Sequence, residues 1–169
     1  MDVYALLGEV KNGGVSIEQA AEKLKQLPYE DLGFARVDHH RKLRTGCAEV
    51  IFCQGKTAEQ VAVIFSRLAE AGSNVLATRA NEEQYQEVKK RIPRAVFHET
   101  AKTITLIVEN VQKGLVAVCT GGTADIPVAE EAAITAEIFG ARVERIYDVG
   151  VSGVHRLLHK IPQINEANA

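Results

Sequence analysis

The chain of 169 residues has no excess of positive charge, because 20 lysines and arginines face 22 aspartates and glutamates and the formal net charge is -2. This balance removes the electrostatic basis for binding nucleic acid. No apolar run reaches the roughly 18 residues that a membrane-spanning helix needs. The first residues carry neither the basic nor the apolar region of a secretory signal peptide. We therefore expect a cytoplasmic protein that binds neither nucleic acid nor membrane.

Cysteine is also scarce, since the chain contains only Cys47, Cys53 and Cys119. An odd number without C-x-x-C spacing argues against a disulfide framework and against a zinc site. Cys47 and Cys53 flank a predicted strand, where small apolar packing is the expected role. His155 and His159 are four residues apart and could share a helix face, but no third ligand is in view. We therefore predict no bound metal.

The composition, with 46% hydrophobic residues, is typical of a globular protein. Two amphipathic helical patterns open it, and the second begins at a capping box formed by Ser16 and Gln19. Short strands and helices then alternate up to a boundary near 111–113. The predicted class is α/β, with an N-terminal helical arm, a small α/β domain and the first βαβ part of a parallel sheet, at residues 1–31, 32–111 and 112–169.

The functional prediction depends on the last part. An apolar run at 114–120 ends in two glycines, a helical pattern follows to 139, and a second strand is predicted at 142–147. This order predicts a right-handed crossover between parallel strands, so the turns that follow both strands lie where open α/β sheets bind ligands. A sheet of two strands keeps a long unpaired edge, so we expect another chain or further protein to complete it. The last helix is expected to end at Pro162.

The first of these turns is a candidate phosphate site. Gly121 and Gly122 let a ligand approach the backbone closely, and the amides at the start of the next helix favour an anion. Thr120 and Thr123 add hydroxyl groups, while Asp125 could cap the helix or hold a ribose hydroxyl. The alternative is an ordinary strand-to-helix turn with Asp125 as N-cap.

The second turn contains Gly153 and is followed by His155 and Arg156. A histidine at this edge can move protons near neutral pH, which makes His155 the candidate catalytic residue. The guanidinium of Arg156 can pair with a phosphate or a carboxylate through two hydrogen bonds. The alternative is a surface helix start with a solvated arginine.

The most basic stretch of the chain is at 39–44. It contains His40, Arg41 and Arg44, which could clamp the phosphates of a ligand. A solvated loop is the alternative interpretation.

Several of these segments, taken in order, resemble the LarB family, the pyridinium-3,5-biscarboxylic acid mononucleotide synthases of nickel-pincer cofactor assembly. The matching segments are 38–44 (Asp-His-His-Arg-Lys-Leu-Arg), 49–51, 55–57, 120–132 and 148–156 (Asp-Val-Gly-Val-Ser-Gly-Val-His-Arg). The third part is also similar to PurE, the carboxyaminoimidazole ribonucleotide mutase. There a Gly-Ser-x-Ser-Asp loop is followed by Ser-Ala-His-Arg, and residues 121–125 and 152–156 stand in those places here.

The resemblance implies an enzyme that carboxylates the pyridinium ring of nicotinic acid adenine dinucleotide and hydrolyses its phosphoanhydride, releasing AMP. Its substrates would be the dinucleotide and CO2 or bicarbonate, with no tightly bound cofactor, and the fold would be a PurE-like three-layer sheet in a homo-oligomer. The family continues beyond the matched segments with another strand, an acid-bearing turn and a covalently used cysteine, to which Cys119 does not correspond. We therefore expect this chain to be an incomplete form.

Two other functions stay open. One is a PurE-like carboxylase or mutase acting on an aminoimidazole ribonucleotide, against which the extra block before residue 111 argues. The other is a non-catalytic nucleotide-binding module that uses the partial sheet and the helical arm as interfaces.

Overall fold

The computed structural model describes residues 3–25, 29–39, 41 and 48–169. It divides the chain into two compact units, Met1–Glu49 and Val50–Ala169. The fold class is α/β, as the sequence predicts. Among the helices of the described residues, none has the length and apolar character to cross a membrane.

The first unit is a helical hairpin followed by a short β-ribbon. Helix α1 (Val3–Lys11) contacts α2 (Ile17–Lys25), and the ribbon pairs β1 (Glu30–Asp31) antiparallel with β2 (Arg36–Val37). The predicted capping box is confirmed, because the Ser16 and Gln19 side chains each accept the other's backbone N–H, at 3.1 Å in both directions.

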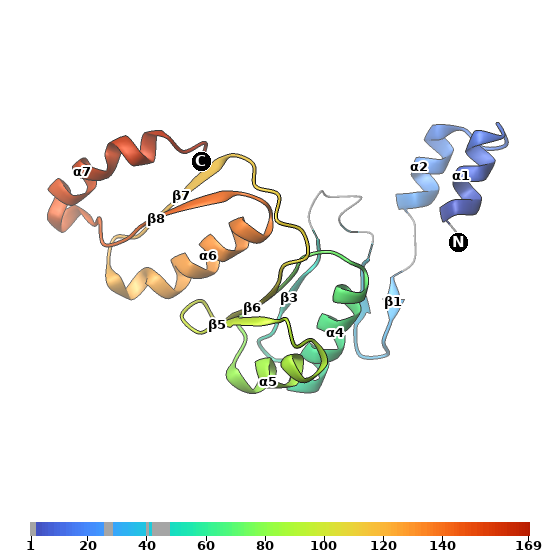
Figure 1. The fold of residues 1–169 in the computed structure, drawn as a ribbon, viewed down its shortest axis with the longest axis horizontal. Helices are drawn as coiled ribbons and strands as arrows, with labels where there is room; N and C mark the ends of the chain where they lie inside the picture. The colour runs from blue at the N-terminus through green and yellow to red at the C-terminus, as the bar shows by residue number, and fades with distance from the viewer. Residues whose placement is uncertain (1–2, 26–28, 40, 42–47) are drawn as a thin grey trace. The chain divides into compact units, whose positions relative to one another are not determined.

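The second unit begins with a four-stranded sheet of order β3-β4-β6-β5 (Figure 1). Its strands are β3 (Val50–Phe52), β4 (Val75–Thr78), β5 (Val96–His98) and β6 (Thr103–Leu106). Helix α4 (Ala58–Glu70) joins the parallel strands β3 and β4, while β6 runs antiparallel to both its neighbours. Helix α5 (Glu82–Arg91) packs on α4.

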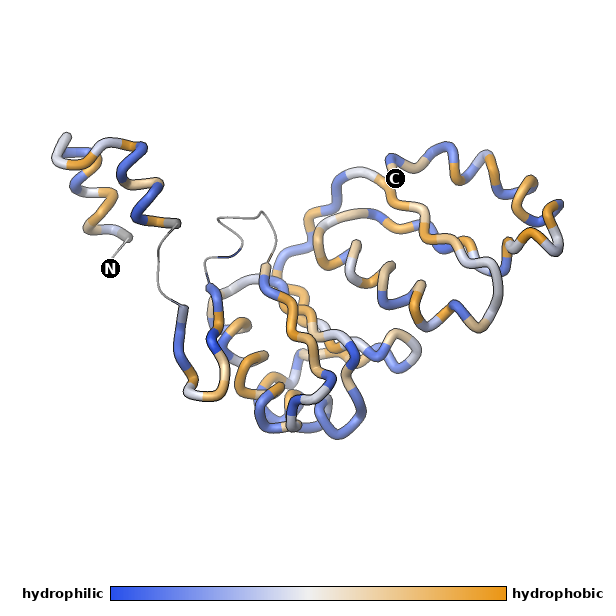
Figure 2. Tube along the Cα trace, turned by 180° about the vertical axis from the view of Figure 1, so that it is seen from behind, coloured by the Kyte–Doolittle hydropathy of each residue, from blue (hydrophilic) through white to orange (hydrophobic). Residues whose placement is uncertain are grey.

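The core of this unit lies on both faces of the sheet. Figure 2 shows the hydrophobic colour following its central strands. On one face Leu76 clusters with Ile134 and Ile138 of α6 (Ile126–Ile138). Since side chains alternate along a strand, its neighbours Val75 and Ala77 point to the other face, where α4 contacts β4. Helix α6 therefore covers the first sheet and also belongs to the next βαβ element.

That element places the candidate site. Strand β7 (Leu115–Cys119) pairs in parallel with β8 (Arg142–Ile146), and α6 connects them and contacts both. The predicted parallel pair is confirmed, with both following turns at one edge. The outer edge of β7 carries the last residues of the chain, because Asn168 N–H donates to Leu115 O at 2.7 Å and Ala117 N–H to Ala169 O at 2.8 Å.

The predicted end of the last helix is wrong. Helix α7 spans Val154–Asn165 and contains Pro162. A proline within a helix removes one N–H bond and crowds the carbonyl four residues earlier, which costs stability but leaves the hydrogen bonds of the following residues possible. One further turn therefore continues beyond it, before the hydrogen bonds of Asn168 to β7.

Candidate functional site

A depression lies at the carboxyl ends of β7 and β8 and takes its walls from both turns that the sequence singles out. It has a volume of about 540 Å³ and is open to solvent, a size within the range of roughly 300–1,000 Å³ typical of ligand sites. The residues that line it are Cys119, Thr120, Gly121, Val149, Gly150, Val151, Ser152 and Leu157.

Thr120 ties the two turns together. Its backbone N–H donates to Ile146 O at 3.1 Å, and its carbonyl accepts the N–H of Val149 at 2.9 Å. Its buried hydroxyl accepts the N–H of Asp148 at 3.1 Å. Three hydrogen bonds therefore hold Thr120 as part of the floor of the depression and occupy its hydroxyl oxygen with a backbone donor.

The floor itself is a contact between two glycines. A Cβ at Gly150 would overlap the carbonyl oxygen of Gly121 and lie 3.0 Å from its carbonyl carbon. Because no side chain fits between the two backbones, the turns approach closely and leave peptide groups at the surface.

Asp125 stands at the N-cap position of α6, as the alternative interpretation has it, but its side chain does not cap the helix. Thr123–Asp125 form a turn of 3-10 helix, and α6 begins at Ile126 with Pro127 next. The Asp125 carboxylate accepts the N–H of Gly122 at 3.1 Å and makes no capping bond to α6. Asp125 therefore closes the turn, and Gly122, Thr123 and Asp125 flank the depression without lining it.

The start of α7 carries the other predicted residues. Arg156 forms an ion pair with Asp148, and its guanidinium packs on Gly153, where an added Cβ would lie 2.7 Å from Nε. His155 is exposed on the first turn of α7. The sequence placed these residues at the correct edge, but it missed the pairing of Arg156 with Asp148.

Cys119 and Ser152 also line the depression, which sequence reasoning did not anticipate. Cys119 ends β7 and is exposed, whereas Cys53 is fully buried as the packing prediction requires. Burial raises the pKa of the Cys53 thiol to about 12, so that cysteine is inert. The signal for Ser152 was present, since it belongs to the small-residue turn after β8.

Beside the depression, a charged network fixes β8 against α6. Arg145 bonds both carboxylate oxygens of Glu137, at 2.6 and 3.1 Å, and Nε donates to Glu130 at 3.2 Å. The Tyr147 hydroxyl donates to Glu130 at 2.8 Å. Partial burial and this bond raise the pKa of the Tyr147 phenol to about 12. The phenol therefore stays protonated at neutral pH and acts as a support for the strand that leads to Asp148.

The first unit holds the other predicted residues. His40 and Arg44 lie outside the described residues, and Arg41 is exposed. Next to them, His39 Nε2 lies 2.8 Å from Glu30 Oε2. The site role of this segment stays a prediction.

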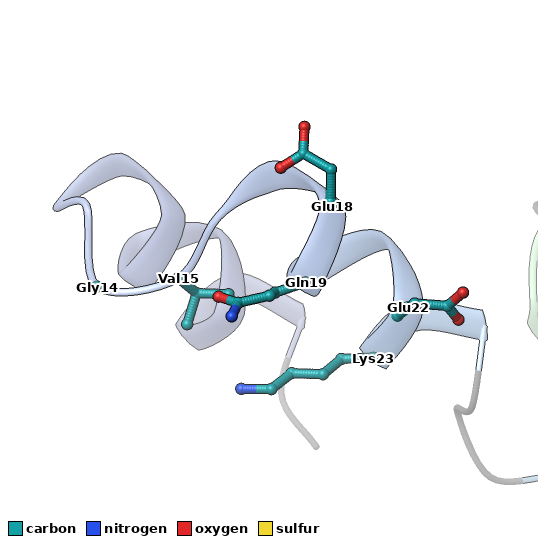
Figure 3. Close-up of a pocket in the computed structure, with 6 residues that line it drawn as sticks. All are labelled: Gly14, Val15, Glu18, Gln19, Glu22 and Lys23. Atoms are coloured by element: carbon teal, nitrogen blue, oxygen red, sulfur yellow. The ribbon is translucent and has the colours of Figure 1, made fainter.

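A second depression lies on the helical hairpin of the first unit (Figure 3). The carboxylates of Glu18 and Glu22 point away from the Lys23 ammonium there, and Gln19 Oε1 already accepts the N–H of Ser16 at 3.1 Å. Within the part of the chain that the structure describes, no three histidine, cysteine, aspartate or glutamate side chains group as metal ligands. The depression on β7 and β8 is therefore the better candidate.

Comparison with known proteins identifies a domain that precedes the depression in the chain. Residues 29–109 match the family model of the LarB/PurE-like N-terminal domain. The uncharacterized protein MJ0165 of Methanocaldococcus jannaschii is 35% identical over 170 residues, covering 95% of this chain, and the chain spans 66% of that relative's length. The fold and the depression define an α/β protein with a candidate ligand site at the carboxyl ends of a parallel strand pair. Within residues 29–109 the chain carries a LarB/PurE-like N-terminal domain.

Proposed function

We propose that this chain carboxylates the pyridinium ring of nicotinic acid adenine dinucleotide and hydrolyses its phosphoanhydride, releasing AMP, in nickel-pincer cofactor biosynthesis. The observation that carries the proposal is the depression built from the Gly121 and Gly150 turns, in a chain that carries a LarB/PurE-like N-terminal domain. The substrates are the dinucleotide and CO2 or bicarbonate, and no tightly bound cofactor takes part. The enzyme acts in the cytoplasm as a homo-oligomer.

The exposed peptide groups of the two turns suit the anionic part of the dinucleotide. Gly121 and Thr123 are proposed to offer backbone and hydroxyl donors before α6, where a helix N-terminus favours phosphate. Gly122, whose N–H is held by Asp125, is proposed to let the phosphate approach the backbone closely. The second carboxylate oxygen of Asp125 is available to a ribose hydroxyl, since the hydrogen bond from Gly122 uses only the first.

Carboxylation forms a bond between a ring carbon and CO2 and removes the proton of that carbon. His155, exposed on the first turn of α7, is the proposed proton acceptor. Arg156 is the proposed phosphate partner, together with Gly153 beneath its guanidinium. In the first unit, His40, Arg41 and Arg44 are proposed to bind phosphate as well.

Calorimetric titration tests the substrate assignment. The chain is titrated with nicotinic acid adenine dinucleotide and, in parallel, with aminoimidazole ribonucleotide, while released AMP and fixed labelled bicarbonate are measured separately. Tighter binding of the dinucleotide with both products is the expected result. Preference for the aminoimidazole ribonucleotide would favour a PurE-like mutase, and binding without either product would favour a non-catalytic nucleotide-binding module.

A matched pair of variants tests the location. Val151 is 85% exposed and lines the depression, whereas Val128 is 60% exposed on α6 and does not line it. Val151→Trp should fill the depression and weaken dinucleotide binding by more than about tenfold, the effect of a steric loss near 1.4 kcal/mol. Val128→Trp should bind as the unchanged chain does. Equal effects of the two changes would place the site elsewhere.

A further inference from the structure

The guanidinium of Arg156 is already engaged by protein groups. Nη1 forms an ion pair with Oδ2 of Asp148, and the flat guanidinium packs on the backbone of Gly153. An anion that approaches Nη1 therefore meets the negative charge of the Asp148 carboxylate and competes with it.

The position of Asp148 is set by the backbone and is independent of Arg156. Asp148 has a φ of 59°, in the left-handed region that aspartate and asparagine tolerate better than most residues. Its N–H is held by the Thr120 hydroxyl at 3.1 Å. The backbone of Asp148 is therefore held in place by contacts that do not involve Arg156.

The ion pair is weak enough to be exchanged. The side chains of Arg156 and Asp148 are 40% and 46% exposed, and pairs this exposed contribute little net stability because water screens them. A phosphate presents several strong acceptors, so it can replace Asp148 at Nη1.

We propose that Asp148 is a positioning residue that competes with the ligand's anion for Arg156 and so lowers the affinity of the site for anions. This inference rests on the proposed contact between Arg156 and the anionic part of the nucleotide. By pairing with Nη1, Asp148 lowers the affinity for every anion by a similar factor. Weak anions are then left largely unbound, while a ligand held by further contacts stays bound.

A double-mutant cycle tests the competition. Asp148→Asn removes the charge but keeps a residue that tolerates the left-handed backbone and the N–H bond to Thr120. It is compared with Arg156→Gln, with the double variant, and with Glu166→Gln, which removes one exposed negative charge at the far end of α7. Inorganic pyrophosphate, acetate and nicotinic acid adenine dinucleotide are titrated calorimetrically into each, and thermal unfolding checks that all variants fold.

Asp148→Asn should tighten pyrophosphate binding by about two- to fivefold, the range that an exposed ion pair permits. Acetate binding should gain by a similar factor, because an internal competitor lowers the affinity for every anion alike. Neither gain should occur in the Arg156→Gln background, and Glu166→Gln should change nothing. A structural defect in Asp148→Asn would weaken pyrophosphate binding, whereas loss of a competitor for Arg156 tightens it. The sign of the change therefore distinguishes a structural defect from competition.

Other outcomes overturn the inference. These are weaker or unchanged pyrophosphate binding in Asp148→Asn, the same gain in the Arg156→Gln background, unaltered binding in Arg156→Gln, or no binding of pyrophosphate by the unchanged chain. The proposed substrate stands apart from this result. If Asp148→Asn tightens pyrophosphate binding only when Arg156 is present, but the chain does not prefer the dinucleotide, the substrate assignment fails and the role of Asp148 stands. If the chain prefers the dinucleotide but Asp148→Asn does not tighten pyrophosphate binding, the role of Asp148 fails and the substrate assignment stands.

Discussion

Gly121 and Gly150 face each other, but only Gly150 lacks room for a side chain. A Cβ added at Gly150 would overlap the Gly121 carbonyl oxygen and lie 3.0 and 3.3 Å from its carbonyl carbon and Cα. A Cβ added at Gly121 would meet nothing closer than 3.9 Å, namely Asp125 Oδ2 and the Cα of Gly150. Gly150→Ala should therefore push the turns apart, while Gly121→Ala is the matched control.

The size of the effect follows from what would have to move. The atoms in the way are backbone, and the adjacent residue Thr120 is held by hydrogen bonds to Ile146 and Val149. Overpacking in such a place typically costs about 1–3 kcal/mol, and we expect about 2–3 kcal/mol because no flexible side chain can yield. The φ of Gly150 is -65°, so backbone strain at alanine adds nothing. Gly121→Ala should change stability by less than about 0.5 kcal/mol, or stabilise slightly by reducing the freedom of the unfolded chain.

Amide hydrogen exchange measures this locally. The N–H of Val149, which donates to Thr120 O at 2.9 Å, reports the contact. In Gly150→Ala its exchange should accelerate by about 30- to 150-fold, the equivalent of 2–3 kcal/mol of local opening free energy. In Gly121→Ala it should change by less than about threefold. Similar acceleration in both variants, or none in Gly150→Ala, would refute the account of the glycine contact.

Three further predictions concern the rest of the second unit. Phe65→Ala should lower the free energy of unfolding by about 3–5 kcal/mol in urea, because the ring is fully buried, whereas Phe52→Ala, at a side chain 53% exposed, should lower it by less than about 1 kcal/mol. Thr57→Ala should cost about 1 kcal/mol in the same assay through loss of the capping box of α4. Burial lowers the pKa of His98 below its ordinary 6.5, so the folded state favours the neutral imidazole. The contribution of His98 to stability is therefore fully present above pH 6.5 and is lost as the pH falls through the lowered pKa. His98→Gln should flatten that loss in urea titrations at pH 7.5, 6.0 and 5.0, and an unchanged slope would contradict the assignment.

Much of the fold was predictable because its signals are local. The capping boxes at Ser16, Thr57 and Asn81 mark the starts of three helices, since each pairs a side chain with a backbone N–H only three residues away. The apolar runs and glycines of β7 and β8 mark strands and turns in the same way. Parallel pairing followed from the crossover rule, which depends on element order and not on individual contacts.

The predictions that failed, or were not made, involve groups far apart in the chain. Pro162 marks a helix end by local reasoning, yet α7 continues for one more turn. The pairing of Asn168 with Leu115 spans 53 residues, and no local pattern indicates it. The same holds for Thr120 and Asp148, which are 28 residues apart and meet only when the two turns are folded against each other.

The sequence alone determined the element types, the placing of both glycine turns at one sheet edge and the resemblance to the LarB family, because these depend on short-range periodicity, capping and motif order. Only the tertiary structure decided which glycine is sterically essential, that Arg156 is held by Asp148, and that Cys119 and Ser152 share a depression with Thr120. Those properties depend on contacts between backbones brought together by the parallel pairing of β7 and β8. Close packing sets such contacts to within a fraction of an ångström, a scale to which sequence patterns are insensitive.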